Sequence, residues 1–386
     1  MKVKEVKVYI VETGSYRLPV VEVSTDEGIS GIGEAAVGFG VGANAAAAMI
    51  ADLSRKFVVG KDPSRIMSIW NDFYYDTFWG KGAGPIFYSG VSAIEMALWD
   101  IKGKKLGVPV YELLGGSQRD EIPCYANDWC FDGVTPEDVA NRAEEVLKDG
   151  YTALKLYPLG HVGADGINRH IKLRNVCKED ERICVEKVRL VRKAIGDDVD
   201  LLIDVTAEGT PDTMIRIGRK IEEFNPYYYE EPLDAFDPDS YAYLRSQLST
   251  PIAAGERFYT RYGFRRLIET RGVDIVQPDP GTAGGVMETW RIASMAETYQ
   301  MRITPHNCGG PILTAVCIQL AACLNNFLIQ EVFPYRPDIH YNVVLNPLEK
   351  EIRNGILAVP TLPGLGVLLN HEVVDRFQVG HCETPV

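Results

Sequence analysis

The sequence lacks an excess of basic residues and any long apolar run. Its 386 residues include 40 Lys and Arg against 53 Asp and Glu, a formal net charge of −13. This balance argues against nucleic acid or an anionic membrane as a partner, because both need a basic face. No apolar run reaches the roughly 18 residues of a membrane span, and the first residues lack the apolar core of a signal peptide. We expect a cytoplasmic protein with a small-molecule partner.

Closely spaced cysteines and a dinucleotide-binding motif are also missing. The eight cysteines form no CxxC pair, so we expect buried thiols and not a disulfide framework. No GxGxxG motif follows an early strand, which counts against a dinucleotide-binding fold. The composition, 46% hydrophobic and 24% charged, is that of a folded protein with a large core.

The length suits one large domain and a smaller companion. Residues 1–120 predict an α+β domain, in which alternating apolar and polar residues indicate strands and longer amphipathic stretches indicate helices. The expected strands are 3–11, 20–24 and 29–34, and the expected helices are 43–57, 64–78 and 91–106. Residues 346–386 are rich in Gly and Pro and are expected to pack on this domain.

Residues 121–345 alternate short apolar strands with helical segments. Eight strands separated by helices is the number of a closed parallel barrel, while a doubly wound open sheet is the alternative from periodicity alone. A long insert at 160–179 follows the second strand and predicts either a substrate lid or a packing loop. The predicted strands are 122–127, 153–158, 200–205, 227–232, 251–256, 274–279, 302–307 and 327–331.

Three carboxylates stand at the ends of successive predicted strands. Asp204, Glu230 and Glu256 are separated by 26 residues each (230 − 204 and 256 − 230), the repeat of one strand–helix unit. Because barrel chemistry sits at the carboxyl ends of the strands, this spacing predicts one acidic rim. Oxygen ligands fit Mg²⁺ better than Zn²⁺. Structural ion pairs with Lys155 or Arg257 are the alternative reading of the same acids.

A histidine and an aspartate end the next two strands. Asp279 ends the sixth predicted strand and His306 ends the seventh, so the two side chains are expected in contact. A carboxylate that orients an imidazole makes a competent general base. A histidine satisfied within the core is the alternative.

These residues, in this order, resemble the enolase superfamily, in particular its mandelate racemase-like branch. The resemblance covers essentially the whole chain and is specific for the branch but not for a substrate. Its carriers are Asp204, the Glu230-Glu231-Pro232 triplet, Gly255-Glu256, Asp279, His306 and Glu331, together with the runs at 93–103, 113–116 and 363–366.

The resemblance implies an α/β fold, a modified TIM barrel (β/α)₇β with an α+β N-terminal capping domain. It implies Mg²⁺ as the cofactor and abstraction of the proton next to a substrate carboxylate, with an enediolate to be stabilised. It also implies that Glu331 donates a hydrogen bond to this enediolate. Glu230 is favoured over Glu231 as the metal ligand. Homo-oligomers are common in the branch, so a homo-oligomer is expected.

Two positions depart from the pattern of the branch. Racemases carry Lys-x-Lys on the second strand, whereas this chain has Lys155-Leu156-Tyr157, which disfavours racemisation. Some sugar-acid dehydratases carry a histidine where this chain has Thr206. Lys155 is expected to offset substrate charge, and Tyr157 to be a weak acid or base, a hydroxyl contact or a packing residue. The acid for the leaving hydroxide is therefore left between His306 and Tyr157.

The first hypothesis is a carbon–oxygen hydro-lyase that dehydrates an acid sugar, an aldonate or aldarate, to a 2-keto-3-deoxy acid. The alternatives are an epimerase, racemase or cycloisomerase acting on another α-hydroxy carboxylate, and a metal-binding barrel without turnover. Specificity is expected in capping-domain loops at 14–19, 37–42 and 74–88. The predicted substrate contacts are Thr206, Arg257, Trp129 and Tyr259.

Overall fold

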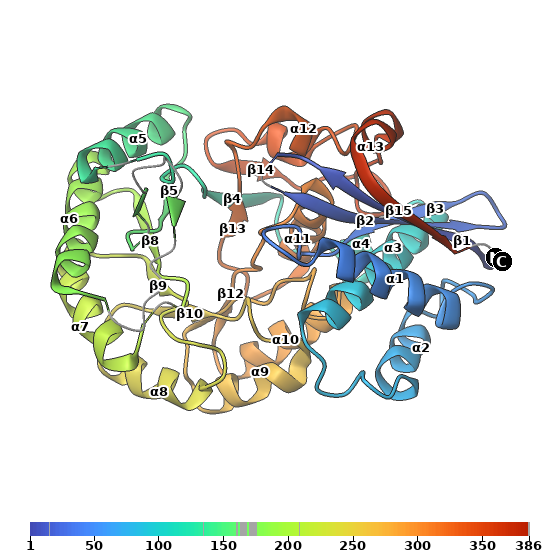
Figure 1. Ribbon diagram of the computed structural model, residues 1–386, viewed down its shortest axis with the longest axis horizontal. Helices are drawn as coiled ribbons and strands as arrows, with labels where there is room; N and C mark the ends of the chain where they lie inside the picture. The colour runs from blue at the N-terminus through green and yellow to red at the C-terminus, as the bar shows by residue number, and fades with distance from the viewer. Residues whose placement is uncertain are drawn as a thin grey trace.

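The computed structural model describes residues 1–14, 16–133, 135–159, 161–162, 168–169, 176–207 and 209–384. It shows a ring of helices around a barrel, with an α+β domain against one side (Figure 1). Within these ranges no helix is both long and apolar enough to cross a bilayer. The described cysteines are free thiols, most of them buried.

The N-terminal domain is built on a four-stranded antiparallel sheet. Its strands are β1 (Val3–Glu12), β2 (Arg17–Thr25), β3 (Ser30–Glu34) and β15 (Gln378–Thr384), in the order β15-β1-β2-β3. Alternate residues of a strand share one face, and Val6 and Val8 are fully buried opposite Val23 and Val21. Figure 1 shows the C-terminal strand β15 lying along β1.

Helices α1 (Ala43–Phe57), α2 (Ile66–Asn71), α3 (Pro85–Leu106) and α4 (Val110–Leu113) complete this part of the chain. The helix predicted within 64–78 is present, but only its first part is a regular α-helix. Helix α2 ends at Asn71 and a π-helical turn, Asp72–Asp76, follows it. In this turn Tyr74 stacks on Trp70 with ring centroids 5.5 Å apart, so aromatic packing replaces regular helix.

The eight predicted barrel strands are present and parallel, and the barrel is confirmed. Neighbours follow the order β12-β11-β10-β9-β8-β5-β4-β13, and a parallel bridge between Ile303 and Phe327 joins the two ends of this row. A further strand, β14 (Ile356–Ala358), pairs antiparallel with β4. The barrel strands are β4 (Glu121–Ala126), β5 (Ala153–Leu156), β8 (Asp200–Asp204), β9 (Tyr228–Glu230), β10 (Ile252–Ala254), β11 (Ile275–Val276), β12 (Arg302–Ile303) and β13 (Gln330–Val332).

Helices between the strands form the outer wall, seen as an arc in Figure 1. Several begin with proline at the first helical positions, where its missing N–H costs nothing, and α5 also has a capping box between Thr135 and Asp138. The wall helices are α5 (Pro136–Lys148), α6 (Lys178–Ile195), α7 (Pro211–Ile221), α8 (Pro238–Ser246), α9 (Thr260–Glu269), α10 (Val286–Thr298) and α11 (Pro311–Cys323). The short helices α12 (Asp338–Tyr341) and α13 (His371–Phe377) follow.

A separate set of buried side chains fills the inside of the barrel. It takes one residue from each of several strands: Tyr125, Ala153, Leu202, Tyr228, Ala253, Ile275 and Ile329. Because side chains alternate along a strand, the residue two positions further also faces inward, but nearer the carboxyl end. Those positions hold Asn127, Lys155, Asp204, Glu230, Gln277 and Glu331. Because side chains alternate along each strand, these polar side chains all point to the same mouth of the barrel.

Candidate active site

A cavity of about 1110 Å³ opens at the carboxyl ends of the barrel strands. The N-terminal domain contributes Tyr16, Val37 and Phe39 to its wall. Glu230 and Glu331 lie beneath the cavity, fully buried, in contact with Lys155. The other ten predicted site residues line it: Trp129, Lys155, Tyr157, Asp204, Thr206, Glu256, Arg257, Tyr259, Asp279 and His306.

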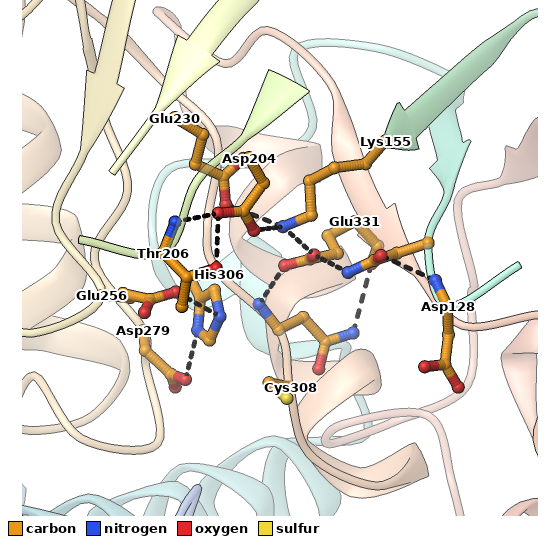
Figure 2. A network of polar contacts seen from close by, with 12 residues as sticks. Asp128, Lys155, Asp204, Thr206, Glu230, Glu256, Asp279, His306, Cys308 and Glu331 are labelled. Atoms are coloured by element: carbon orange, nitrogen blue, oxygen red, sulfur yellow. Dashed lines mark hydrogen bonds and ion pairs between the residues drawn. The ribbon is translucent and has the colours of Figure 1, made fainter. Parts of the chain in front are cut away.

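Lys155, on β5, lies among three carboxylates (Figure 2). Its Nζ is 3.3 Å from Asp204 Oδ2, 2.7 Å from Glu230 Oε1 and 2.6 Å from Glu331 Oε1. Burial disfavours the ammonium, but the three nearby negative charges outweigh it and raise the pKa of Lys155 well above its ordinary value. Lys155 is therefore positively charged in this structure.

Both carboxylate oxygens of Glu331 accept hydrogen bonds. Asn127 Nδ2 donates to Oε1 at 2.8 Å, and the backbone N–H of Asn307 donates to Oε2 at 2.9 Å. Burial opposes ionisation, but Lys155 and His306 outweigh it and lower the pKa of Glu331. The implied donation to an enediolate needs a protonated carboxyl. In this structure Glu331 is an acceptor, and Lys155 is the donor beside it.

His306 joins two carboxylates across the mouth of the barrel (Figure 2). Its Nδ1 is 2.8 Å from Asp279 Oδ2, and its Nε2 is 3.0 Å from Glu256 Oε2. Burial lowers the pKa of His306, but Glu256 and the hydrogen bond to Asp279 raise it more, so it lies well above its ordinary value. Asp279 in turn accepts the backbone N–H of Gly281 at 2.7 Å. The imidazole is thus oriented through Nδ1, and Nε2 faces the cavity rim.

Glu230 and Glu231 are consecutive residues, so their side chains point to opposite faces of the sheet. Glu230 points inward to Lys155, whereas Glu231 accepts the backbone N–H of Gly255 at 2.6 Å and pairs with Arg257 at 3.1 Å. Arg257 Nη1 also lies 2.5 Å from Glu256 Oε1. Glu231 therefore holds Arg257 at the rim, and the inward acid of the pair is Glu230.

The rim acids fit a hard divalent cation in their chemistry. Glu230 Oε2 is buried and has no hydrogen-bond partner, and Asp204 and Glu230 occupy paired positions on neighbouring strands. Burial, with Asp204 and Glu331 adding to it, raises the pKa of Glu230 to about 8 although Lys155 opposes this. Across the described ranges, no three acidic, histidine or cysteine side chains already converge as ligands, because Glu256 is turned to His306 and Arg257.

The remaining predicted contacts differ in their surroundings. Thr206 donates from its N–H and its hydroxyl to Asp204 Oδ1, at 2.8 and 3.0 Å, so it fixes that carboxylate. Tyr157 is buried at the wall beside Phe131, with ring centroids 6.0 Å apart. Trp129 Nε1 is buried without a partner, a free donor at the cavity.

Sequence reasoning missed a second polar group in the wall, formed by Tyr16, Asp128 and Arg336. Arg336 Nη1 is 3.0 Å from Asp128 Oδ2, and its guanidinium carbon is 4.1 Å from the Tyr16 ring centroid. Asp128 follows β4 and Arg336 follows β13, so the rule that strand ends carry chemistry would have singled out both. The insert at 160–179, for which a substrate lid was one prediction, lies largely outside the described residues.

The N-terminal domain holds the loops that carry the His306–Asp279 pair. Glu34, at the end of β3, is fully buried and accepts the N–H groups of Gly310 at 2.5 Å and Leu313 at 3.3 Å, at the start of α11. A Cβ at Gly310 would lie 3.0 Å from Glu34 Oε2 and closer still to Leu18, so glycine permits this approach. The fixed start of α11 thereby positions the segment that follows His306.

Fold and site together define a barrel enzyme with an oriented histidine facing an acidic rim. Residues 3–115 match the N-terminal domain of the mandelate racemase / muconate lactonizing enzyme family, and residues 138–373 match the enolase C-terminal domain-like family. The chain belongs to the enolase superfamily.

Similar proteins agree with this assignment. D-galactonate dehydratase from Ralstonia pickettii (strain 12J) is 35% identical over 93% of this chain and 92% of its own. D-gluconate dehydratase from Thermoproteus tenax is 32% identical over 85% of this chain and 64% of its own. A crystal structure from Mesorhizobium loti, 43% identical, superposes with a TM-score of 0.95 over 99% of this chain and 100% of that one. The protein is thus an enzyme of the lyase class, among the hydro-lyases.

Proposed function

We propose that this enzyme dehydrates an acid sugar, an aldonate or aldarate, to the 2-keto-3-deoxy acid, with Mg²⁺ as cofactor. The observation that carries the proposal is the placement of His306, oriented by Asp279 at 2.8 Å, beside the carboxylates of the rim. The names of the curated relatives, D-galactonate and D-gluconate dehydratase, support an acid sugar as the substrate.

Asp204, Glu230 and Glu256 would hold the metal. When bound, Mg²⁺ supplies the positive charge that offsets a substrate carboxylate and makes the neighbouring C–H more acidic. The unpartnered Glu230 Oε2 supports a cation at this place. Lys155, held by Glu331 below the cavity, adds a second fixed positive charge on the same side.

His306 is the base in this proposal. In this structure Glu256 is the main cause of the raised pKa of His306. With Glu256 turned to the metal instead, Nε2 would lose its proton and be free to remove the proton from C2, while Asp279 keeps Nδ1 in place. The electron pair of the C2–H bond forms the C2–C3 double bond, while the C3–O bond breaks and the hydroxyl leaves with a proton as water. The enol then becomes the 2-keto acid by taking a proton at C3 and releasing the proton of its C2 hydroxyl.

The proton for the leaving hydroxyl comes from His306 or from Tyr157. His306 carries the C2 proton after the first step, so a syn elimination needs no other acid. Tyr157 lines the same cavity and is the donor for an elimination to the opposite face. Thr206 is excluded from this role in our proposal because its hydroxyl already donates to Asp204 at 3.0 Å.

The test is a screen of monoacid and diacid sugars with Mg²⁺, read by formation of 2-keto acid. The proposal predicts product from at least one acid sugar and none after removal of divalent metal. Exchange of the C2 proton with solvent while the hydroxyl is retained would favour an epimerase. An enzyme that converts no acid sugar but exchanges the α-proton of other carboxylates would refute the dehydratase assignment.

A further inference from the structure

The cavity wall opposite the rim carries a built polar group, the triad of Tyr16, Asp128 and Arg336. The Arg336 side chain is 9% exposed and lies over the rings of Tyr16 and Phe333, 4.1 and 4.7 Å from their centroids. It donates to the Tyr16 hydroxyl and pairs with Asp128 at 3.0 Å. An almost fully buried arginine with aromatic rings against its plane keeps a fixed orientation, so its donors are pre-positioned.

Two short paths connect this triad to the reacting centre. The Tyr16 hydroxyl is 3.2 Å from Cys308 Sγ, two residues after His306. Asp128 follows Asn127, whose amide reaches Glu331 Oε1 at 2.8 Å. All three members of the triad line the same cavity as His306 and Lys155. A substrate held at the rim therefore shares one cavity with the triad.

The charges along the cavity wall indicate which chemical group the far end of the substrate carries. Every Lys or Arg of the described cavity lining is already ion-paired: Lys155 in its cluster, Arg257 with Glu231 and Glu256, Arg142 with Asp132 at 2.8 Å, and Arg336 with Asp128. Asp149 adds a further acid to the lining. Burying a second carboxylate without a free cation is costly.

A neutral, hydroxylated end fits the triad instead. A sugar hydroxyl both donates and accepts, and the triad offers acceptors on Asp128, donors on Arg336 and a hydroxyl on Tyr16. Burial raises the pKa of Asp128 to about 6, with Arg336 opposing, so the carboxylate is ionised at neutral pH. The Asp128–Arg336 pair is thus nearly neutral as a whole.

We propose that Tyr16, Asp128 and Arg336 form a specificity site that binds the hydroxyls beyond C3 and selects aldonates over aldarates. This inference rests on the proposed dehydration and names its substrate class. It assigns the triad to recognition of the uncharged end, while the rim binds the carboxylate end. Asp128 is the selecting group, because its carboxylate already pairs with Arg336. Arg336 is then not free to pair with a second carboxylate at the far end of the substrate.

The test compares matched acids that differ only at the far carbon: D-galactonate with galactarate, and D-gluconate with glucarate. D-glycerate has no hydroxyl beyond C3 for the triad to bind, so its turnover measures the dehydration step without the contribution of the triad. We expect the wild type to prefer the aldonate by about tenfold or more in kcat/KM. Arg336→Met should lower kcat/KM for the aldonate about 10- to 100-fold and D-glycerate turnover far less.

Asp128→Asn should free Arg336 and raise the aldarate-to-aldonate ratio of kcat/KM about tenfold or more, a change that a folding defect does not produce. Arg245→Met is the matched control, since Arg245 pairs with Asp274 at 2.5 Å outside the cavity, and we expect it within about twofold of wild type.

Two outcomes separate the claims. A wild type that prefers the aldarate, or an Asp128→Asn variant that loses both acids equally, overturns the specificity site and leaves dehydration standing. If the wild type converts neither of these pairs, the comparison is made with the aldonate and aldarate of the configuration that the acid-sugar screen identifies. Only a wild type that converts no acid sugar at all overturns the proposed function and the specificity site with it.

Discussion

Replacing Glu34 by glutamine should change how the stability of the enzyme depends on pH. Glu34 is fully buried, and burial raises its pKa to about 7, although the N–H groups of Gly310 and Leu313 oppose the rise. Glutamine keeps the size of the side chain and one acceptor, but it cannot ionise. The variant also loses one of the two hydrogen bonds from backbone N–H groups at every pH, so the change of stability with pH isolates the ionisation of this buried group.

The direction and size of this pH effect follow from the thermodynamic linkage between protonation and folding. The folded pKa lies above the unfolded 4.5, so the folded state holds the proton more tightly and stability falls as pH rises from about 4.5 through about 7. The whole gap corresponds to about 3 kcal/mol. Between pH 5 and pH 8, the difference in unfolding free energy between Glu34→Gln and wild type should therefore shift by about 2–3 kcal/mol in favour of the variant.

Urea unfolding at pH 5 and pH 8, followed by far-UV circular dichroism, measures the difference. Glu34→Asp serves as a control that retains an ionisable group at the same position. The reasoning is refuted if the stability of Glu34→Gln relative to wild type does not rise between pH 5 and pH 8. That result would mean that the start of α11 stabilises the ionised carboxylate by more than burial costs.

Three further predictions concern buried charges and the histidine pair. Lys155→Met leaves three carboxylates without their cation and should cost about 3–5 kcal/mol of unfolding free energy, partly recovered by added Mg²⁺ in the same denaturation assay. Arg192→Met removes donors to four backbone carbonyls at 2.7–3.0 Å and should cost about 2–4 kcal/mol; an unchanged urea midpoint would contradict this. Asp279→Asn removes the charge that orients His306 and should lower kcat about 10²–10⁴-fold, with a thermal melt to show that the fold is kept.

The barrel could be predicted because its signal is local and repeated. Short apolar strands recur with helices between them, and each strand ends in a polar residue, so eight strands and an acidic rim follow from the order of residues. The helix within 64–78 was predicted, but its change to a π-helical turn at Asp72–Asp76 was not, because the packing of Tyr74 on Trp70 joins side chains whose contact the helical pattern does not show.

The site was predicted where it depends on strand ends and missed where it depends on partners. The sequence already favours Glu230 over Glu231, and the structure adds that Glu230 faces Lys155 whereas Glu231 accepts from Gly255. The Tyr16–Arg336 contact joins residues 320 positions apart, which no local pattern reveals. The acceptor state of Glu331 likewise depends on Lys155 and His306, which come from other strands.

The most direct test of the account follows the C2 proton of the acid sugar that gives turnover, by ¹H NMR in D₂O with Mg²⁺. The wild type should lose the C2 signal as the 2-keto acid forms. His306→Asn should retain the C2 proton and form no product, whereas His371→Asn, altered at an exposed histidine near Glu22, should match the wild type. Loss of the C2 proton by His306→Asn at a rate near that of wild type would contradict His306 as the base.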